Sequence, residues 1–308
     1  MRTIMVLLVT VLAVAGCGRG GPDPAPTASP SAGTHAYSLR VGDLDRRYQV
    51  HVPAAAVGRT GVPAVIVLHG GGGSGSQVAE QTGFSALSDR EGFLAVYPDG
   101  SGRTKLLTWN AGTCCSYARD QGIDDVGFVR ALIDTLADRF GVGRVYVTGF
   151  SNGAMLTYRV GCELADRITA IAPVSGAMNV PSCDPARPLP VYTLHGDADP
   201  VVPYAGGTSA SRIASEERAG AHRSVAYAVD FWTRADRCTV DPARSVDGAI
   251  TSVRYTACAP GAEVRLDTVA GGGHAWPGGK SVRRGADAPT TELDATAAIW
   301  DFFRTRSG

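Results

Sequence analysis

The feature that most constrains this chain is the segment Gly149–Gly153, with the sequence GFSNG, because of the residues on either side of it. The preceding run, Val145–Thr148, is β-branched and aromatic and predicts a buried strand. The following run, Ala154–Val160, predicts a helix. A strand that turns directly into a helix leaves little room for side chains beside the turn, which explains glycine at both ends. The sequence therefore predicts that Ser151 lies on a tight strand-to-helix turn, where it can act as a nucleophile.

Two later segments supply an acid and a base of the kind that a serine nucleophile needs. Residues 190–196 form a strand pattern that leads into Asp197 and Asp199. Residues 271–279 place His274 on a loop too rich in glycine for a helix or a strand. The order serine, acid, histidine along the chain is that of the α/β-hydrolase triad. We therefore expect His274 to take the proton of the serine, and one of the two aspartates to orient the histidine.

An upstream glycine-rich segment is expected to stabilise the negative charge that develops during acyl transfer. The strand pattern of residues 62–68 ends in His69, which four glycines follow. Main-chain N–H groups of such a loop form one part of an oxyanion hole. We expect the N–H groups of Gly71 and Asn152 to be the two donors.

Two tryptophans are candidates for the walls of the substrate pocket. Trp276 lies two residues after His274, which favours a place in the pocket. For Trp109, an ordinary place in the core is almost as well supported. We expect no cofactor, and no metal because the chain has no Cys-x-x-Cys or His-x-x-x-His spacing.

The remaining patterns predict one α/β domain over residues 36–305. A chain of 308 residues with 44% hydrophobic content can bury a full core, and no linker-like break interrupts this range. The formal net charge is zero, so the chain lacks the excess of positive charge typical of proteins that bind nucleic acid. We therefore do not expect nucleic acid as a partner. Strand and helix patterns alternate, as in a mostly parallel central sheet with helices on both faces. We expect strands over 37–41, 48–52, 62–69, 93–97, 144–150, 168–174, 191–195 and 264–269, and helices over 125–139, 153–165, 225–237 and 293–303.

The N-terminus is expected to be a lipoprotein export signal. Residues 4–15 form an apolar run that is short for a bilayer span and has the length of a signal-peptide core. The run leads into Val14–Cys17, which resembles the bacterial lipobox, whose cysteine is lipidated and becomes the first residue of the mature protein. We therefore expect a signal peptide over residues 1–17, a membrane anchor on Cys17 and a disordered tether over residues 18–35. An ordinary signal peptide with an incidental cysteine is the alternative.

Export into an oxidising compartment would allow the six remaining cysteines to form disulfides. Cys238 follows a helical pattern and Cys258 follows a strand-like one, so we expect these two to pair. Cys162 lies near the end of the helix that follows the serine turn, and Cys183 precedes a strand on the same side of the sheet, so a second bridge between them is reasonable. The adjacent pair Cys114–Cys115 is left to form a bridge or to remain as thiols.

Several segments together resemble one known group of enzymes. They are residues 109–115 (WNAGTCC), 124–128 (DDVGF), 149–153 (GFSNG), 195–204 (HGDADPVVPY) and 271–279 (GGGHAWPGG). In this order they resemble the polyhydroxybutyrate depolymerase and feruloyl esterase group, carbohydrate esterase family one, over essentially all of residues 36–305. The resemblance implies an α/β-hydrolase fold, and its His-Gly-x-x-Asp spacing implies Asp199 rather than Asp197 as the acid. The lipobox adds a similarity to actinobacterial lipoprotein esterases of the LpqC type.

We therefore expect a secreted, membrane-tethered serine ester hydrolase that acts on small or oligomeric esters through an acyl-enzyme. The resemblance leaves the substrate open among hydroxyalkanoate oligomers, feruloylated sugars and acetylated sugars, because the group includes enzymes for all three. A non-catalytic surface lipoprotein that uses the hydrolase fold as a binding module is the alternative. A binding module need not keep the serine, the acid, the histidine and the oxyanion loop together, so their joint presence favours the enzyme.

Overall fold

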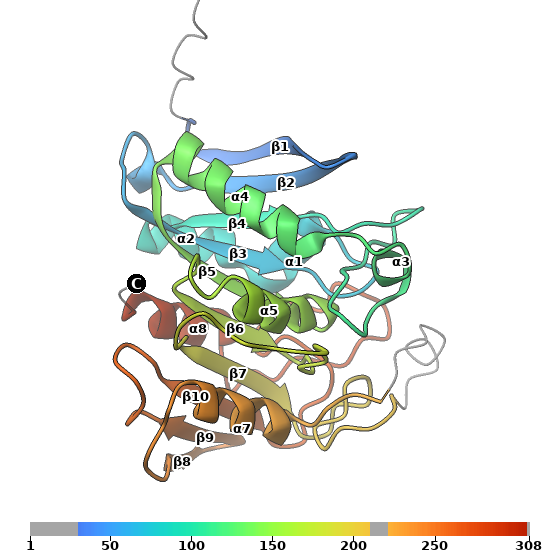
Figure 1. The fold of residues 1–308 in the computed structure, drawn as a ribbon, viewed down its shortest axis with the longest axis vertical. Coiled ribbons are helices and arrows are strands. Elements are labelled where there is room, and N and C mark those ends of the chain that lie inside the picture. The colour runs from blue at the N-terminus through green and yellow to red at the C-terminus, as the bar shows by residue number, and fades with distance from the viewer. Residues whose placement is uncertain (1–29, 210–220, 307–308) are drawn as a thin grey trace, which may run out of the picture.

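A ten-stranded sheet organises the residues that this computed structural model describes, 30–209 and 221–306. Its strands are β1 (Gly33–Val41), β2 (Leu44–Val52), β3 (Val62–Leu68), β4 (Leu94–Pro98), β5 (Val142–Phe150), β6 (Ala170–Val174), β7 (Val191–Gly196), β8 (Ala243–Asp247), β9 (Ile250–Tyr255) and β10 (Val264–Val269). They lie in the order β1-β2-β4-β3-β5-β6-β7-β10-β9-β8 (Figure 1). The central strands from β4 to β10 are parallel, and antiparallel strands form both edges.

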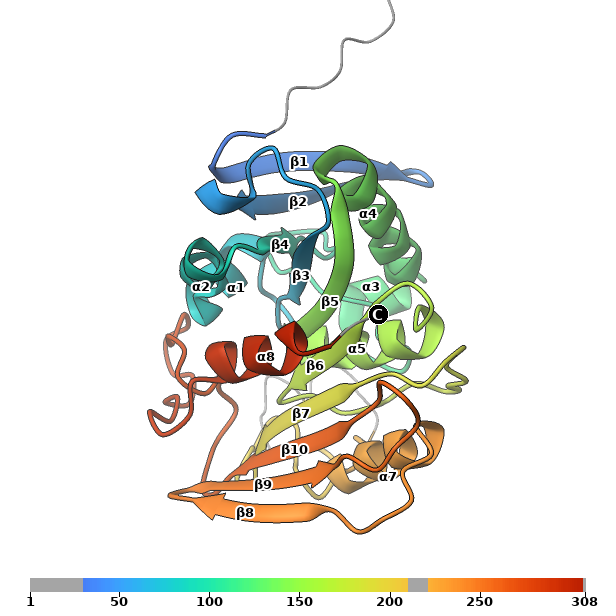
Figure 2. The ribbon, with the colours of Figure 1, turned by 90° about the vertical axis from the view of Figure 1, so that its left-hand side faces the viewer.

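Helices cover both faces of the sheet. They are α1 (Gly75–Thr82), α2 (Phe84–Glu91), α3 (Ser116–Asp120), α4 (Asp125–Phe140), α5 (Asn152–Glu163), α7 (Val225–Ala235) and α8 (Ala295–Arg304), with a short 3-10 turn at Ala54–Ala56. Helices α4, α5 and α7 pack on one face, and α1, α2 and α8 pack on the other (Figure 2). Strands such as β6 and β7 are buried along their whole length because helices lie on both sides of them. Across the second face, the ring of Tyr146 on β5 stacks on Phe303 of α8 at 4.7 Å.

The predicted fold class is confirmed, with a mostly parallel central sheet and helices on both of its faces. Helices α1 and α2 were not predicted, because each has only eight residues and Gly83 separates them in a left-handed conformation with φ 71°. Strand β8 was not predicted either. All five of its residues are exposed, so it lacks the alternation that marks a half-buried strand.

The N-terminal predictions lie largely outside the described residues. The expected signal peptide over residues 1–17, with Cys17, falls there, as does most of the expected tether over residues 18–35. The last residues of that tether are ordered, because β1 begins at Gly33 and pairs with β2. Within residues 30–209 and 221–306, no helix is both long and apolar enough to cross a membrane.

Within the described residues, the six cysteines form three disulfides. Cys162, near the end of α5, is bonded to Cys183, and Cys238, which follows α7, is bonded to Cys258. Both pairings are those that the sequence predicts. The adjacent residues Cys114–Cys115, which the sequence left open, are bonded to each other.

The parallel centre of the sheet gathers the predicted functional loops at one edge. The carboxyl ends of parallel strands meet at the same edge, where open α/β sheets bind their ligands. His69 follows β3, Ser151 follows β5, Asp199 follows β7 and His274 follows β10. The fold therefore brings together four loops that are far apart in the sequence.

Candidate active site

Ser151 occupies a tight turn between β5 and α5. Its backbone has φ 56° and ψ −119°, a region that residues with side chains rarely adopt. The flanking glycines are required by close packing. A Cβ at Gly149 would lie 2.6 Å from the backbone of Gly153, and a Cβ at Gly153 would lie 2.3 Å from the carbonyl oxygen of Leu68. The turn thus presents the serine hydroxyl at the edge of the sheet.

The structure places Ser151, His274 and Asp199 in one hydrogen-bonded line. Nε2 of His274 lies 2.9 Å from Oγ of Ser151, and Nδ1 lies 2.8 Å from Oδ2 of Asp199. A proton on Nδ1 can be donated to the carboxylate, which leaves Nε2 to accept the proton of the serine. This geometry is the one that activates a serine hydroxyl as a nucleophile.

Asp199 is surrounded by hydrogen-bond donors. The N–H groups of Val201 and Val202 each donate to Oδ1 at 2.8 Å, and Nε2 of His195 lies 3.4 Å from Oδ2. Burial alone would raise the pKa of this carboxyl, but the imidazoles of His195 and His274 outweigh it and hold the pKa well below its usual range. Asp199 therefore remains a carboxylate, the state that can accept the His274 proton.

Two other aspartates brace the loops around the histidine. Asp197, the competing candidate for the acid, is exposed, and its carboxylate accepts the N–H of Gly271 at 2.6 Å. Asp287 accepts the main-chain N–H of His274, also at 2.6 Å. The sequence did not single out Asp287, because it lies thirteen residues after the histidine in an irregular loop. Both aspartates hold the loop of His274, and the imidazole itself is bonded to Asp199.

Asn152 connects the helix after the serine to a neighbouring loop. It is the first residue of α5, where main-chain N–H groups have no partner within the helix. Its side chain exchanges two hydrogen bonds with the main chain of Trp109, at 2.8 and 3.0 Å. The main-chain N–H of Asn152, one of the two predicted oxyanion donors, thus lies at a braced helix N-terminus beside Ser151.

His69 has a role that the sequence did not predict. Its Nε2 accepts the N–H of Gly100 at 2.9 Å, so the proton is on Nδ1, which donates to the carbonyl oxygen of Gly70 at 2.8 Å. The N–H of Gly73 donates to the same oxygen at 2.9 Å. Because this carbonyl and the N–H of Gly71 belong to one planar peptide, the two bonds orient the second predicted oxyanion donor. Burial lowers the pKa of His69 to about 4, so the ring is neutral at physiological pH.

The two predicted pocket tryptophans differ, because Trp276 lines the cavity and Trp109 does not. Trp109 is fully buried and does not line the cavity, so its predicted place in the pocket is wrong and the core alternative is correct. Its Nε1–H donates to the carbonyl oxygen of His69 at 2.8 Å and so supports the start of the predicted oxyanion loop. Trp276 adjoins the cavity, but its indole is fully buried, packs edge-on against Phe84 at 6.1 Å and donates to Oγ1 of Thr296 at 3.0 Å.

A cavity of about 400 Å³ opens at the serine, a volume typical of sites for small ligands. One part of its lining is apolar and buried, and includes the Cys114–Cys115 pair, Met155 and Val202. Another part comes from residues 280–287, which are mostly exposed and carry charged side chains. Among the residues that the structure describes, no group of three His, Cys, Asp or Glu side chains could hold a metal ion.

Comparison with known proteins identifies the family. Residues 118–224 match the family model described as Phospholipase/Carboxylesterase. A protein named "Putative esterase NocK", from Nocardia uniformis subsp. tsuyamanensis, is 31% identical over 96% of this chain and 94% of its own length. The chain belongs to the carboxylesterase family. This carboxylesterase is therefore a serine ester hydrolase, which favours the enzyme over the binding module that the sequence left open.

Two further proteins are similar to this carboxylesterase. Feruloyl esterase B from Piromyces equi is 32% identical over 76% of this chain, which spans 44% of that protein. The structure of acetyl xylan esterase from Aspergillus awamori covers 87% of this chain and 99% of its own, with a TM-score of 0.58 and 14% identity. At that identity the likeness concerns the fold, and it confirms the predicted α/β-hydrolase class.

Proposed function

We propose that this carboxylesterase cleaves its ester substrates by forming an acyl-enzyme on Ser151. The observation that carries the proposal is the hydrogen-bonded line from Ser151 through His274 to Asp199, at 2.9 and 2.8 Å, in the lining of a cavity. A serine hydroxyl is a poor nucleophile at neutral pH unless a base within hydrogen-bond reach accepts its proton. His274 meets that condition.

In the first half-reaction, Oγ of Ser151 attacks the carbonyl carbon of the ester while its proton passes to Nε2 of His274. The Asp199 carboxylate stabilises the imidazolium that forms. The main-chain N–H groups of Gly71 and Asn152 donate to the oxyanion, and each such donor typically contributes about 2.7–4 kcal/mol of transition-state stabilisation. The imidazolium then returns its proton to the leaving alcohol, and the acyl group stays on the serine.

In the second half-reaction, a water molecule takes the place of the alcohol. His274 accepts a proton from the water as its oxygen attacks the acyl carbon, and the same N–H donors bind the second oxyanion. When this intermediate collapses, the proton returns to Oγ of Ser151 and the carboxylic acid leaves. The enzyme is then ready for another substrate molecule.

We infer that the substrates are monomeric or short oligomeric esters, with esters of aromatic acids favoured. A cavity of about 400 Å³ suits a ligand of this size, and the relative from Piromyces equi is named a feruloyl esterase. Parallel rates on methyl ferulate, hydroxybutyrate oligomers and acetylated xylan test this proposal. A preference for hydroxybutyrate oligomers would place the enzyme among depolymerases instead.

We further propose that residues 36–305 form an exported catalytic domain that a lipid on Cys17 holds at the membrane. The lipobox pattern of Val14–Cys17 supports the anchor. The disulfides Cys162–Cys183 and Cys238–Cys258 support export, because such bonds persist in oxidising compartments.

The decisive experiment on the mechanism compares Ser151→Ala with the wild-type enzyme. Turnover of p-nitrophenyl acetate is expected to fall by about 10⁶, because the triad acts as a unit. A serine-directed phosphonate is expected to label Ser151 in the wild type, as read by peptide mass spectrometry. Ser245→Ala, on the exposed edge strand β8, is the matched control and should keep full activity. Activity of Ser151→Ala within about tenfold of the wild type would contradict the proposal.

A further inference from the structure

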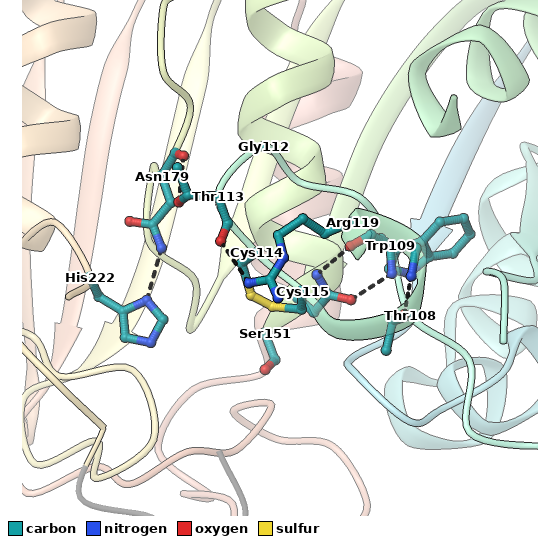
Figure 3. Close-up of a disulfide and its surroundings, with 12 residues drawn as sticks. Thr108, Trp109, Gly112, Thr113, Cys114, Cys115, Arg119, Ser151, Asn179 and His222 are labelled. Atoms are coloured by element: carbon teal, nitrogen blue, oxygen red, sulfur yellow. Dashed lines mark hydrogen bonds between the residues drawn. A yellow bond between two sulfur atoms is a disulfide. The ribbon is translucent and has the colours of Figure 1, made fainter. Parts of the chain in front are cut away.

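Cys114 and Cys115 form a disulfide in the lining of the cavity, beside Ser151 (Figure 3). Both cysteines are almost completely buried, at 1% and 4% exposure. Among the described residues that line the cavity, neither Cys162–Cys183 nor Cys238–Cys258 occurs, so this disulfide is the one that lies at the nucleophile. The proposed mechanism makes no use of it.

The loop that carries this disulfide is positioned by hydrogen bonds that do not involve sulfur. The N–H of Cys115 donates to the carbonyl oxygen of Trp109 at 3.1 Å. Oγ1 of Thr113 donates to the carbonyl oxygen of Asn179 at 3.0 Å, and the Arg119 guanidinium donates to the carbonyl oxygen of Thr113 at 3.2 Å (Figure 3). The position of the loop therefore has support that is independent of the sulfur–sulfur bond.

Apolar side chains share the cavity lining with the disulfide. Met155 and Val202 line the same cavity, belong to the same buried hydrophobic cluster as the two cysteines, and are each 2% exposed. His222 also lines this cavity, and Nδ2 of Asn179 donates to its Nδ1 at 2.8 Å (Figure 3). Burial lowers the pKa of His222 below that of an exposed imidazole, which favours the neutral ring. A polar or charged substrate group would lose its hydration here without a charged partner in return.

The charged part of the cavity belongs to the segment that carries the proposed base. Residues 280–287 follow His274 in the chain and include Lys280 and Arg284, both exposed. In the proposed mechanism the leaving alcohol takes its proton from His274, so the alcohol must lie on the His274 side of the serine. The acyl group is then left to the apolar side, next to the disulfide.

We propose that the Cys114–Cys115 disulfide is the specificity-determining wall of the acyl site and selects aromatic or bulky apolar acyl groups. This inference rests on the proposed acyl-enzyme mechanism at Ser151. Two adjacent sulfur atoms present a compact, polarisable surface, and sulfur packs favourably against aromatic rings. An acetyl group is too small to use such a wall, whereas a phenylpropionyl group extends along it.

The test measures kcat/KM for two series of esters with the double variant Cys114→Ala/Cys115→Ala. In the acyl series, methyl acetate is compared with methyl 3-phenylpropionate. In the alcohol series, methyl acetate is compared with benzyl acetate. The variant should lower the phenylpropionate-to-acetate ratio by about tenfold or more, the usual size of an apolar-pocket preference, and leave the benzyl-to-methyl ratio within about threefold.

Reduction of the wild-type enzyme provides a second test that needs no variant. A water-soluble phosphine converts the disulfide to two thiols. The phosphine supplies two electrons and becomes a phosphine oxide, whose oxygen comes from water, and the two protons of that water end on the sulfurs. The phenylpropionate-to-acetate ratio of kcat/KM should fall on reduction and return on reoxidation. Alkylation followed by peptide mapping counts the thiols at each stage. The double variant Cys114→Ala/Cys115→Ala should show no such change.

The matched control is Cys238→Ala/Cys258→Ala, which removes a disulfide that does not line the cavity. It should leave both ratios unchanged even where it lowers Tm. An equal loss on all esters in the Cys114→Ala/Cys115→Ala variant would show a purely structural disulfide and overturn the inference. A change confined to the alcohol series would overturn the acyl-side assignment. Absence of phosphonate labelling at Ser151 in the wild type would instead defeat the proposed mechanism, so the two failures are distinguishable.

Discussion

Replacing His69 by glutamine is expected to slow catalysis although His69 lies outside the proposed triad. The Nδ1–H of His69 donates to the carbonyl oxygen of Gly70, whose peptide also contains the N–H of Gly71. A glutamine amide reaches as far as the Nε2 position of the imidazole. It can replace the acceptor for the N–H of Gly100 and leaves the Gly70 carbonyl without its side-chain donor.

The expected magnitude follows from the two bonds that hold this carbonyl. The N–H of Gly73 still donates to it at 2.9 Å in the variant, so one of two bonds is lost. A single hydrogen bond contributes about 0.5–1.5 kcal/mol, which corresponds to a change in rate of about 2- to 13-fold. We therefore expect kcat to fall by about 2- to 13-fold in His69→Gln. Complete loss of the Gly71 donor would cost about 10²–10³, which sets the upper limit.

His69→Asn is the matched control, because an asparagine amide reaches only as far as Nδ1. It can keep the donor to Gly70 and loses the acceptor for the N–H of Gly100. We expect its kcat to stay within about threefold of the wild type, while its free energy of unfolding falls by about 1 kcal/mol. Steady-state hydrolysis of p-nitrophenyl acetate and urea unfolding measure the two effects. Equal kcat in His69→Gln and wild type, or an equal loss in both variants, would refute the positioning role.

The same residue gives a pH signature in stability. Burial lowers the pKa of His69 to about 4 from 6.5 for an exposed histidine. Between these values the unfolded chain binds more protons than the folded protein, so this histidine's contribution to stability falls as pH decreases through that window. His69→Gln has no such group and should lose less free energy of unfolding between about pH 6.5 and pH 4 than the wild type does. Parallel curves over that window would contradict the buried neutral imidazole.

Three further predictions concern acids and the anchor. Asp199→Asn should lower turnover by about 10⁴ and Asp197→Asn far less, and the reverse order would move the acid role to Asp197. Burial raises the pKa of Asp236 to about 7 from 3.8, and its Oδ2 has no partner, so the folded protein binds more protons than the unfolded chain between these values. Asp236→Asn should therefore raise Tm relative to wild type by an amount that grows from about pH 4 to pH 7, and a pH-independent gain would count against it. Wild-type protein from membranes should partition into detergent and Cys17→Ser should not, whereas a water-soluble wild type would end the lipoprotein proposal.

The sequence by itself determined the features whose chemistry is local. The tight strand-to-helix turn leaves no room for side chains at positions 149 and 153, where the chain has glycine. The serine turn is therefore recognisable in the sequence as a short motif. The glycines after His69 and around His274 mark loops in the same way. The alternation of strand and helix patterns was enough for the α/β class, and helix and strand ends were enough for the pairings Cys162–Cys183 and Cys238–Cys258.

Only the tertiary structure decided which side chains meet, because the contacts join residues far apart in the chain. His274 lies 75 residues from Asp199 and 123 from Ser151, and no local pattern records such distances. The packing of the four loops also decided that Trp109 lies in the core and not in the pocket wall. There its Nε1–H donates to the carbonyl oxygen of His69. It placed the Cys114–Cys115 disulfide beside the nucleophile, where the loop that carries it is also bonded to the distant residue Asn179. The sequence shows which residues can act as nucleophile, acid or base. Only the folded sheet shows which of these side chains are close enough to interact.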